Sequence, residues 1–285
     1  MSDTQNASQQ GSILPNAKVF IEGRYKKLTR DLPQTIFYCP DCKGHPRRRR
    51  KCERCEGFGK LTRDSVQELV CYVLGSALKT RKNKFHGAGR EDIDVRMLGE
   101  GRPFVVEFKN PKCMDVDLAA LETEINRRNE GRLEVLGLHW SEKPRVVVLK
   151  ESKHAKEYGA LLEIEGGAEM ADFAKLPQGR VQLAQQTPQR VAHRRADKVR
   201  ERWVEFVSVD ATDDPHLWRL RMRTEHGTYV KEAITGEGGS TEPSFSSLIG
   251  KPARCVELDV FDILDEGGDL IERPKAPLGF GDGVY

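Results

Sequence analysis

The sequence lacks any long apolar segment. Its longest apolar runs have the length of a β-strand, as at residues 146–149, whereas a helix that spans a bilayer needs about 20 apolar residues. Residues 2–16 are polar, carry no basic start and contain no apolar core, so they do not resemble a signal peptide. These absences argue against a membrane protein or a membrane partner, and they predict a cytoplasmic protein with a disordered tail at residues 1–17.

Net charge is also small, because 47 lysines and arginines are offset by 44 aspartates and glutamates in 285 residues. The basic residues are nevertheless clustered. An unbroken cationic run covers residues 47–51, and a second cluster lies within residues 190–202. Local clusters on a nearly neutral chain indicate a polyanionic partner, although each of them alone is equally typical of a solvated helix face.

Four of the seven cysteines are grouped, while the other three are scattered and, without a secretory signal, are expected to be reduced. The grouped residues form two Cys-x-x-Cys pairs separated by nine residues: Cys39, Cys42, Cys52 and Cys55. Four thiolates in this spacing are typical of tetrahedral Zn²⁺, and a full set of four leaves no open position for catalysis. We therefore predict a structural zinc ion in a ribbon-like cysteine module at residues 38–60; a pair of redox disulfides is the alternative.

Hydrophobic periodicity predicts an α+β fold, in which a central, mixed and mainly antiparallel sheet carries flanking helices. The clearest helix begins near Asp64, because Asp64 and Gln67 have the spacing of an N-cap and its third helical residue. Residues 92–98, 99–101 and 103–108 predict the two strands and the turn of a hairpin. The other expected elements are strands at 18–22, 133–138, 145–149, 202–210, 217–222 and 255–263, and helices at 116–129, 153–158 and 168–175.

Three acids lie within residues 91–94, at the start of the predicted hairpin. On a strand, Asp92 and Asp94 would share one face. Three interpretations stay open at this point. The segment is an exposed, salt-bridged strand start; or one aspartate is a nucleophile or base beside a cation; or Asp94 and Glu107 hold Mg²⁺ while Lys109 steadies a water, as in PD-(D/E)xK nucleases.

A series of short motifs carries a family resemblance. They are residues 23–30 (GRYKKLTR), 33–35 (PQT), 89–99 (GREDIDVRMLG), 101–104 (GRPF), 110–111 (NP), 187–188 (TP), 193–195 (HRR), 227–232 (GTYVKE), 246–248 (SSL) and 257–260 (ELDV). In these motifs and in their order, the sequence resembles the archaeal and eukaryotic tRNA pseudouridine synthases that modify uridines 54 and 55, the tenth pseudouridine synthase family. The resemblance covers about residues 18–263.

The resemblance implies a pseudouridine synthase fold and an isomerase that converts uridine 54 and/or 55 of the TΨC arm to pseudouridine. It makes Asp92 the catalytic aspartate of an Arg-x-Asp motif, Tyr229 the tyrosine that packs against the target base, and Lys231 the basic residue paired with the aspartate. Leu248 would line the uracil pocket. The other residues implied to bind substrate are Arg90, Lys27, His193, Arg194 and Arg195.

These implied roles agree with the chemistry. The enzyme has to hold a flipped-out uracil while it turns, and a lysine beside Asp92 would favour the ionised carboxylate that acts as nucleophile or base. No metal or organic cofactor is expected to take part in the reaction. A non-catalytic zinc-ribbon protein that binds RNA is a further alternative to the nuclease.

The sequence also departs from the family pattern. Relatives usually carry an N-terminal THUMP-containing domain, whereas the match here begins near Lys18, close to the first residue of the sequence, so we expect that domain to be absent. The cysteine module lies within the predicted catalytic region, residues 18–271, which a tail at 272–285 follows. Zinc and the cationic loop would then replace part of the tRNA-binding surface, and a separate THUMP-type partner is the alternative source of that surface.

Overall fold

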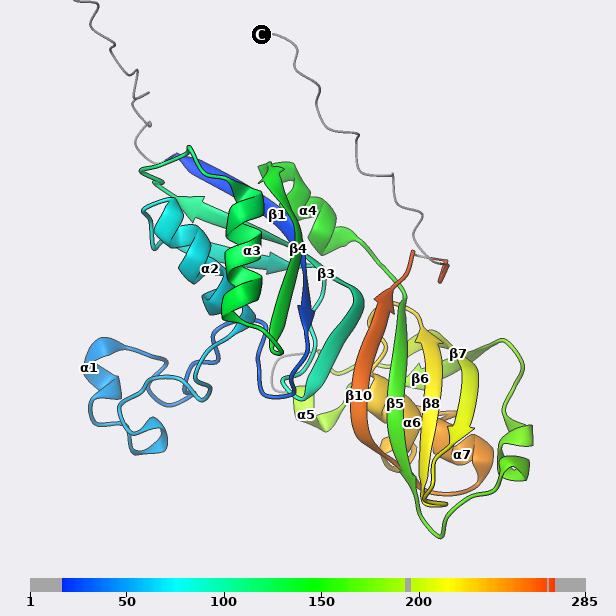
Figure 1. The fold of residues 1–285 in the computed structure, drawn as a ribbon. Coiled ribbons are helices and arrows are strands. Elements are labelled where there is room, and N and C mark those ends of the chain that lie inside the picture. Colours follow the sequence, from blue (N-terminus) through cyan, green and yellow to red (C-terminus); the bar gives the residue numbers. More distant parts are fainter. Residues whose placement is uncertain (1–16, 193–195, 266, 270–285) are drawn as a thin grey trace, which may run out of the picture. The chain divides into compact units, whose positions relative to one another are not determined.

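The computed structural model describes residues 17–192, 196–265 and 267–269, and Figure 1 shows the path of the chain. The chain divides into two compact units, Met1–Ile93 with Arg102–Glu151 and Asp94–Gly101 with Ser152–Tyr285. Both units combine helices with a sheet whose strand pairs are mostly antiparallel. The predicted α+β class is therefore confirmed. None of the helices in the described residues is both long and apolar enough to cross a membrane.

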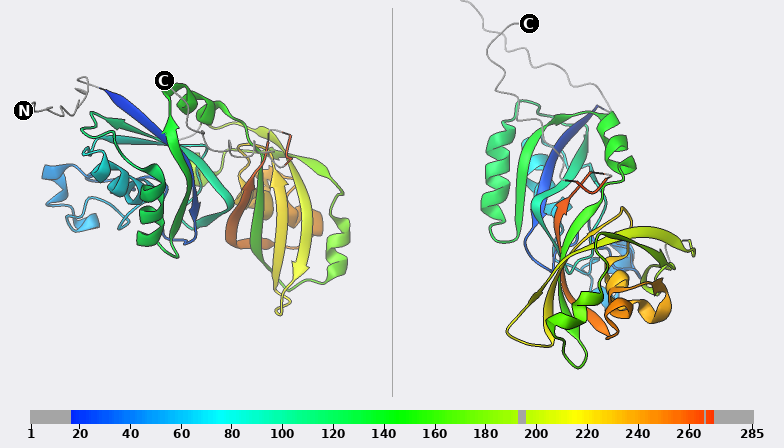
Figure 2. Two further views of the ribbon diagram at one scale, coloured as in Figure 1. Left: turned by 45° about the horizontal axis from the view of Figure 1, so that its top comes forward. Right: turned by 90° about the vertical axis from the view of Figure 1, so that its right-hand side faces the viewer.

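The first unit is a sheet with helices on both faces. Its elements are β1 (Lys18–Lys27), β2 (Asn83–Gly87), the second half of β3 (Val95–Lys109), β4 (Leu133–Ser141), α2 (Val66–Ala77), α3 (Leu118–Arg128) and α4 (Lys143–Glu151), with the strands in the order β4-β1-β3-β2. Side chains of β3 alternate between the faces. The ring of Phe108 packs against Gly75 of α2, whereas Val105 packs against Leu149 of α4. Figure 2 shows α3 and α4 on opposite faces of this sheet.

The second unit is a sheet with its short helices gathered on one face, as Figure 1 shows for α6 and α7. Its elements are the first half of β3, β5 (Lys156–Ile164), η2 (Met170–Lys175), β6 (Arg180–Gln185), α5 (Gln189–Ala192), β7 (Arg200–Ala211), β8 (Leu217–Thr224), α6 (Val230–Thr235), η3 (Glu237–Gly239), β9 (Thr241–Glu242), α7 (Phe245–Ile249) and β10 (Ala253–Ile263), with the strands in the order β3-β10-β5-β8-β7-β6-β9. The rings of Phe173 from η2, Trp218 from β8 and Phe245 from α7 form the aromatic part of its core.

The predicted hairpin at residues 92–108 is wrong. Strand β3 starts at Val95 and continues through the glycines, and its first residues pair in parallel with β10. Gly99 has a φ of 53°, and a Cβ there would lie 1.8 Å from the carbonyl oxygen of Phe261. Glycine therefore permits a close approach of two strands here rather than a reversal of the chain. Residues 92–94 precede the strand, so the prediction that Asp92 and Asp94 share a strand face is also wrong.

Three local assignments differ as well. Residues 145–149, expected to be a strand, form part of helix α4. Val146 and Leu149, three residues apart, both face the sheet, whereas the two valines between them are about half exposed, which is the spacing of a helix. Residues 156–158, expected to be helical, begin strand β5. The N-cap of α2 is Ser65, whose hydroxyl accepts a hydrogen bond from the Glu68 N–H, and Asp64 instead binds an arginine.

Candidate functional site

The four grouped cysteines converge on one point in the first unit. All four Sγ atoms lie within 4.8 Å of one another, with Cys39 and Cys52 at 3.7 Å and Cys42 and Cys55 at 3.6 Å. A zinc tetrahedron with Zn–S bonds of about 2.3 Å has sulfur–sulfur edges of about 3.8 Å, whereas a disulfide bond is about 2.05 Å long. No other group in the described residues offers three or more such ligands to one ion. The thiols therefore fit a metal centre and not a disulfide pair.

The cysteine module has little else to hold it together. Its buried cluster consists of cysteines alone, around the short helices α1 (Pro46–Arg49) and η1 (Glu53–Cys55). The N–H of Gly59 donates to the Sγ of Cys55 at 3.1 Å, and the N–H of Cys42 lowers the pKa of the Cys39 thiol to about 7. The Cys42 N–H therefore favours the thiolate form of Cys39, which is the form that binds zinc, whereas burial raises the pKa of the Cys42 thiol. Figure 1 shows the module projecting from its unit around α1.

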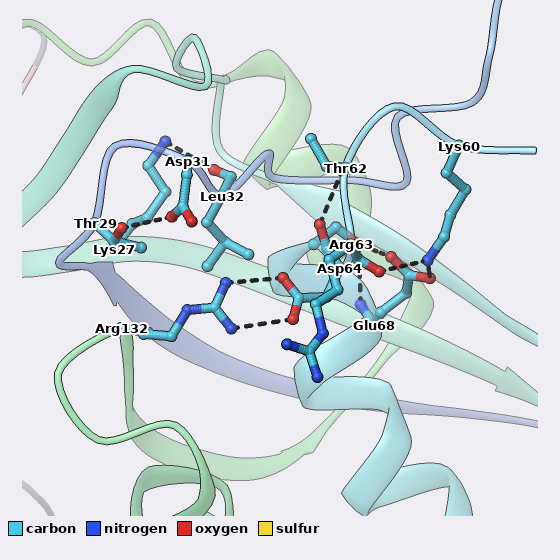
Figure 3. Close-up of polar contacts among 11 residues, drawn as sticks. Lys27, Thr29, Asp31, Leu32, Lys60, Thr62, Arg63, Asp64, Glu68 and Arg132 are labelled. Carbon is cyan, nitrogen blue, oxygen red and sulfur yellow. Dashed lines mark hydrogen bonds and ion pairs between the residues drawn. The ribbon is translucent and has the colours of Figure 1, made fainter. Parts of the chain in front are cut away.

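Polar contacts fix the chain where it leaves the module and enters α2, as Figure 3 shows. Lys60 binds Glu68 at 2.6 Å, and the hydroxyl of Ser65 donates to the same carboxylate at 2.8 Å. Asp64 directly precedes Ser65. Its two carboxylate oxygens accept hydrogen bonds from two guanidinium nitrogens of Arg132 at 2.9 and 3.0 Å. These contacts tie the return segment of the module to the body of the first unit.

Asp92 belongs to the Asp92 loop, residues 88–93, in the same unit. The ammonium group of Lys27 donates hydrogen bonds to the carbonyl oxygens of Leu32, Asp92 and Ile93 at 2.9, 3.0 and 2.9 Å, and its side chain is fully buried. Lys27 was assigned to RNA binding by the resemblance. Because its three donors face the main chain inside the unit, its position favours a role in shaping the Asp92 loop over direct contact with RNA.

A buried ion pair anchors the residue next to Asp92. The carboxylate of Glu91 lies 2.8 Å from the guanidinium group of Arg102, and both side chains are 1% exposed. The hydroxyl of Tyr25 donates to Glu91 at 2.8 Å and accepts a hydrogen bond from Gln34 at 2.9 Å. Arg102 also donates to the carbonyl oxygen of Ala88, at the start of the loop. The loop backbone is thereby held on both sides of Asp92 by fixed partners.

Tyr229 is the N-cap residue of α6 in the second unit. Buried Gln185 of β6 clamps its backbone, because the side-chain amide accepts from the Tyr229 N–H and donates to the Tyr229 carbonyl, both at 3.0 Å. The guanidinium groups of Arg190 and Arg200 lie 6.0 and 5.8 Å from the ring centroid. Arg190 is held in turn by buried Glu232 at 2.6 Å. The backbone of Tyr229 is thus fixed, and its ring lies beside two guanidinium groups, of which that of Arg190 is paired with a carboxylate.

Lys231 and Leu248 also belong to the second unit. The ammonium group of Lys231 lies 2.7 Å from the carboxylate of Asp94. The resemblance instead paired Lys231 with Asp92, two residues earlier. Leu248 is half-buried on α7, which begins at a Ser244–Ser247 capping box. Arg90 is exposed in the Asp92 loop. The predicted RNA contacts His193, Arg194 and Arg195 lie outside the described residues.

The residues of the nuclease hypothesis have other partners. Glu107 binds Lys18 at 2.9 Å and lies 3.7 Å from the imidazole of His86. Asp94 binds Lys231. Each carboxylate already has a cation of the protein as its neighbour, and this arrangement does not favour a shared Mg²⁺ ion.

Sequence reasoning did not single out the residues that position the predicted site. Glu91, Arg102, Gln185 and Arg200 all contact a predicted site residue or the loop that carries it. Glu91 and Arg102 lie inside matching motifs, so the resemblance marked their segments without giving them a role. The order of motifs offered a signal for these two, whereas Gln185 lies outside the matching motifs and Arg200 was marked only as a member of the basic cluster at residues 190–202.

Comparison with known proteins identifies the family. The family model described as "Pus10, C-terminal" matches residues 20–264. Proteins named tRNA pseudouridine synthase Pus10 are 49% identical over 247 residues in Methanothermobacter marburgensis, 43% over 258 in Methanocaldococcus jannaschii and 43% over 263 in Korarchaeum cryptofilum. These matches cover 86%, 90% and 90% of this chain.

The chain spans 60%, 54% and 69% of the length of these three relatives. Among solved structures, a Cbf5–Nop10–Gar1 complex aligns with a TM-score of 0.39 and 18% identity, over 70% of this chain and 45% of that one. The family model covers most of the chain, and each of the three named relatives matches at least 86% of it. The chain therefore belongs to the Pus10 family, to which the sequence motifs pointed, and it corresponds to the C-terminal part of that family.

Proposed function

We propose that this chain catalyses the isomerisation of uridine to pseudouridine in the TΨC arm of tRNA, at position 54, 55 or both. The main support is the family match over residues 20–264, together with relatives that carry the name tRNA pseudouridine synthase. The Arg90-x-Asp92 motif falls inside this match. A fixed loop around a carboxylate is also what such chemistry requires, because a misplaced catalytic group loses rate steeply.

In this proposal Asp92 is the nucleophile or base. The N1–C1′ bond of the target uridine breaks, the freed uracil turns, and a C5–C1′ bond forms. The proton on C5 is lost and N1 gains one, so the product has the mass of the substrate and no oxidant or reductant takes part. Tyr229 stacks on the base, Leu248 forms an apolar wall of its pocket, and Lys231 supplies positive charge that favours ionised carboxylates.

The test is release of tritium from tRNA labelled at C5 of uridine, combined with carbodiimide mapping of pseudouridine. Replacing Asp92→Asn should lower the rate at least about 100-fold, because a group that must act as base or nucleophile is lost. Asp213→Asn, at an exposed aspartate, is the matched control and should keep the rate. Activity of the Asp92→Asn protein equal to that of the control would overturn the proposal.

We further propose that Cys39, Cys42, Cys52 and Cys55 hold one structural Zn²⁺. Support comes from sulfur spacings that match a zinc tetrahedron. Metal analysis should find about one zinc per chain, and Cys42→Ser should lower this while Cys255→Ser should not. Because the metal is proposed to fold the module and not to react, turnover should withstand a brief chelator treatment, and Lys109→Ala should leave it intact. A nuclease would lose activity in both cases.

A further inference from the structure

The cysteine module concentrates the positive charge of the chain. Residues 38–60 contain eight lysines and arginines and three acids, a net of +5, although the whole chain carries only +3. The rest of the chain is therefore slightly acidic. Four thiolates around Zn²⁺ would add a charge of −2 in the interior of the module, and this would not change the cations on its surface.

The cationic run has no counter-charge of its own. Residues 47–51 are all exposed, and none of them forms an ion pair with a carboxylate in the part of the chain that the structure describes. Arginines elsewhere in the same unit are used differently, since Arg102, Arg132 and Arg145 bind carboxylates at 2.8, 2.9 and 2.6 Å. Five adjacent cations repel one another, and this repulsion is relieved when a polyanion binds.

Exposed aromatic side chains accompany these cations. Tyr38 and Phe58 are 52% and 51% exposed although both are large and apolar. The ring of Tyr38 lies against Gly44, where an added Cβ would be 2.5 Å from it. The ammonium group of Lys60 lies 5.1 Å from the centroid of the Phe58 ring. Flat, fixed and exposed rings among cations are the pattern on which unpaired bases stack.

From this combination we propose that the cysteine module is an RNA-binding surface. The cations of residues 47–51 contact phosphates of the tRNA, and Tyr38 or Phe58 stacks on an unpaired base. An acidic protein would match the charge as well, but it would give the exposed rings no base to stack on. The inference rests on the proposed function for the identity of the RNA, and it adds a contact surface that the reaction chemistry does not involve.

The test uses the full chain with zinc bound and the triple variant Arg47→Gln, Arg48→Gln, Arg50→Gln. Arg49 is kept because the aliphatic part of its side chain packs over Gly59. Affinity for unmodified tRNA is measured over a range of salt concentrations. Losing three phosphate contacts should weaken binding about tenfold and lower the slope of log K against log salt by about 2. KM should rise with kcat nearly unchanged, and the zinc content should stay at one.

The matched control removes three exposed cations from another place in the same unit, with Arg81→Gln, Lys82→Gln and Lys84→Gln. Its affinity and salt slope should stay close to those of the parent. Phe58→Ala should weaken binding of single-stranded RNA several-fold without changing the salt slope. RNA should also compete for the module far better than polyglutamate of equal charge.

Two results would overturn the inference. One is an unchanged affinity for tRNA in the module triple variant, and the other is an equal loss in the control triple variant, because it would show only the effect of net charge. Equal competition by polyglutamate would identify the partner as an acidic protein and contradict RNA. Failure of the proposed function is distinguishable, since the parent protein would then bind tRNA through the module but release no tritium.

Discussion

Two segments of the first unit, the Asp92 loop and the cysteine module, are held in place by different interactions. The loop is fixed from inside the unit by a buried ion pair between Glu91 and Arg102 and by the ammonium group of Lys27. The module has a buried cluster that consists of its cysteines alone and keeps its cationic run exposed. The proposed catalytic carboxylate would require a fixed position, whereas the proposed binding surface would require accessible groups, and the two kinds of support match these needs.

The difference has an energetic consequence. Partners in the Asp92 loop are buried in the unit, so removing one of them leaves an uncompensated charge or donor and destabilises the whole sheet. The four cysteines of the module are close in sequence, so removing the proposed zinc ion should affect residues 38–60 first. The comparison therefore predicts that loss of the metal unfolds the module and leaves the rest of the unit intact. Loss of a buried partner of the Asp92 loop should instead lower the stability of the whole unit, by a smaller amount.

The largest effect should follow removal of zinc, because structural zinc sites of this kind contribute about 10 kcal/mol or more to the folding of the segment that binds the metal. After chelation, or in Cys42→Ser, hydrogen exchange of the Cys39 and Phe58 amides should become fast, since both amides donate within the module. Amides of β1 and β4 should stay protected. Cys255→Ser is the control, and protected module amides in the metal-free protein would contradict the prediction.

The module could be predicted from the sequence for a physical reason. Its ligands all fall in the short segment from Cys39 to Cys55, and the geometry of Cys-x-x-Cys turns is set locally, so spacing alone indicates the site. The helix at α2 was predicted for the same reason, since its apolar spacing is local. Its N-cap was placed one residue early, because Asp64 and Ser65 are both good caps and only the bond from Asp64 to Arg132 separates them.

The support of the Asp92 loop could not be predicted in this way. Glu91, Arg102 and Tyr25 come from three separate segments, and in the sequence a buried arginine looks like an exposed one. The false hairpin has a related cause. The glycines of residues 99–101 were interpreted as a turn, but the first residues of β3 pair with β10 near the other end of the chain, where Val95 lies opposite Leu258. Local signals do not contain such pairings.

The next largest effect is expected for Arg102→Ala. The variant leaves the carboxylate of Glu91 buried without its cation, and breaking a buried ion pair from one side typically costs about 3–5 kcal/mol. The free energy of unfolding from urea titration should fall by this amount. Arg254→Ala, which breaks the exposed pair with Glu163, should cost less than about 1 kcal/mol. Equal losses in the two variants would contradict the prediction that the buried ion pair contributes more to stability than the exposed one.

A smaller effect is expected for Tyr25→Phe. Burial raises the pKa of Tyr25 well above its usual value, so its hydroxyl stays a donor to Glu91 at any ordinary pH. The variant removes this bond and the acceptor of one Gln34 bond, while Gln34 keeps its bond to the Gly89 carbonyl. A loss of about 1–2 kcal/mol follows. The double variant with Arg102→Ala should lose less than the sum, because both residues act on one carboxylate, and strict additivity would contradict a shared network.

The smallest effect concerns the pair of Asp64 and Arg132 beside the return segment of the module (Figure 3). Hydrogen bonds from Arg132 hold the pKa of Asp64 below its usual value of 3.8. A carboxyl group with a lowered pKa stabilises the folded state above its unfolded pKa and loses this contribution as the pH falls through the folded one. Because the guanidinium group is more than one-third exposed, solvent screening limits the pair to about 0.5–1 kcal/mol. A double-mutant cycle with Asp64→Asn and Arg132→Gln should give this coupling at pH 7 and a smaller one at pH 2, because protonation of Asp64 removes its charge. A coupling that is the same at both pH values would show that the two side chains interact by packing and not by charge.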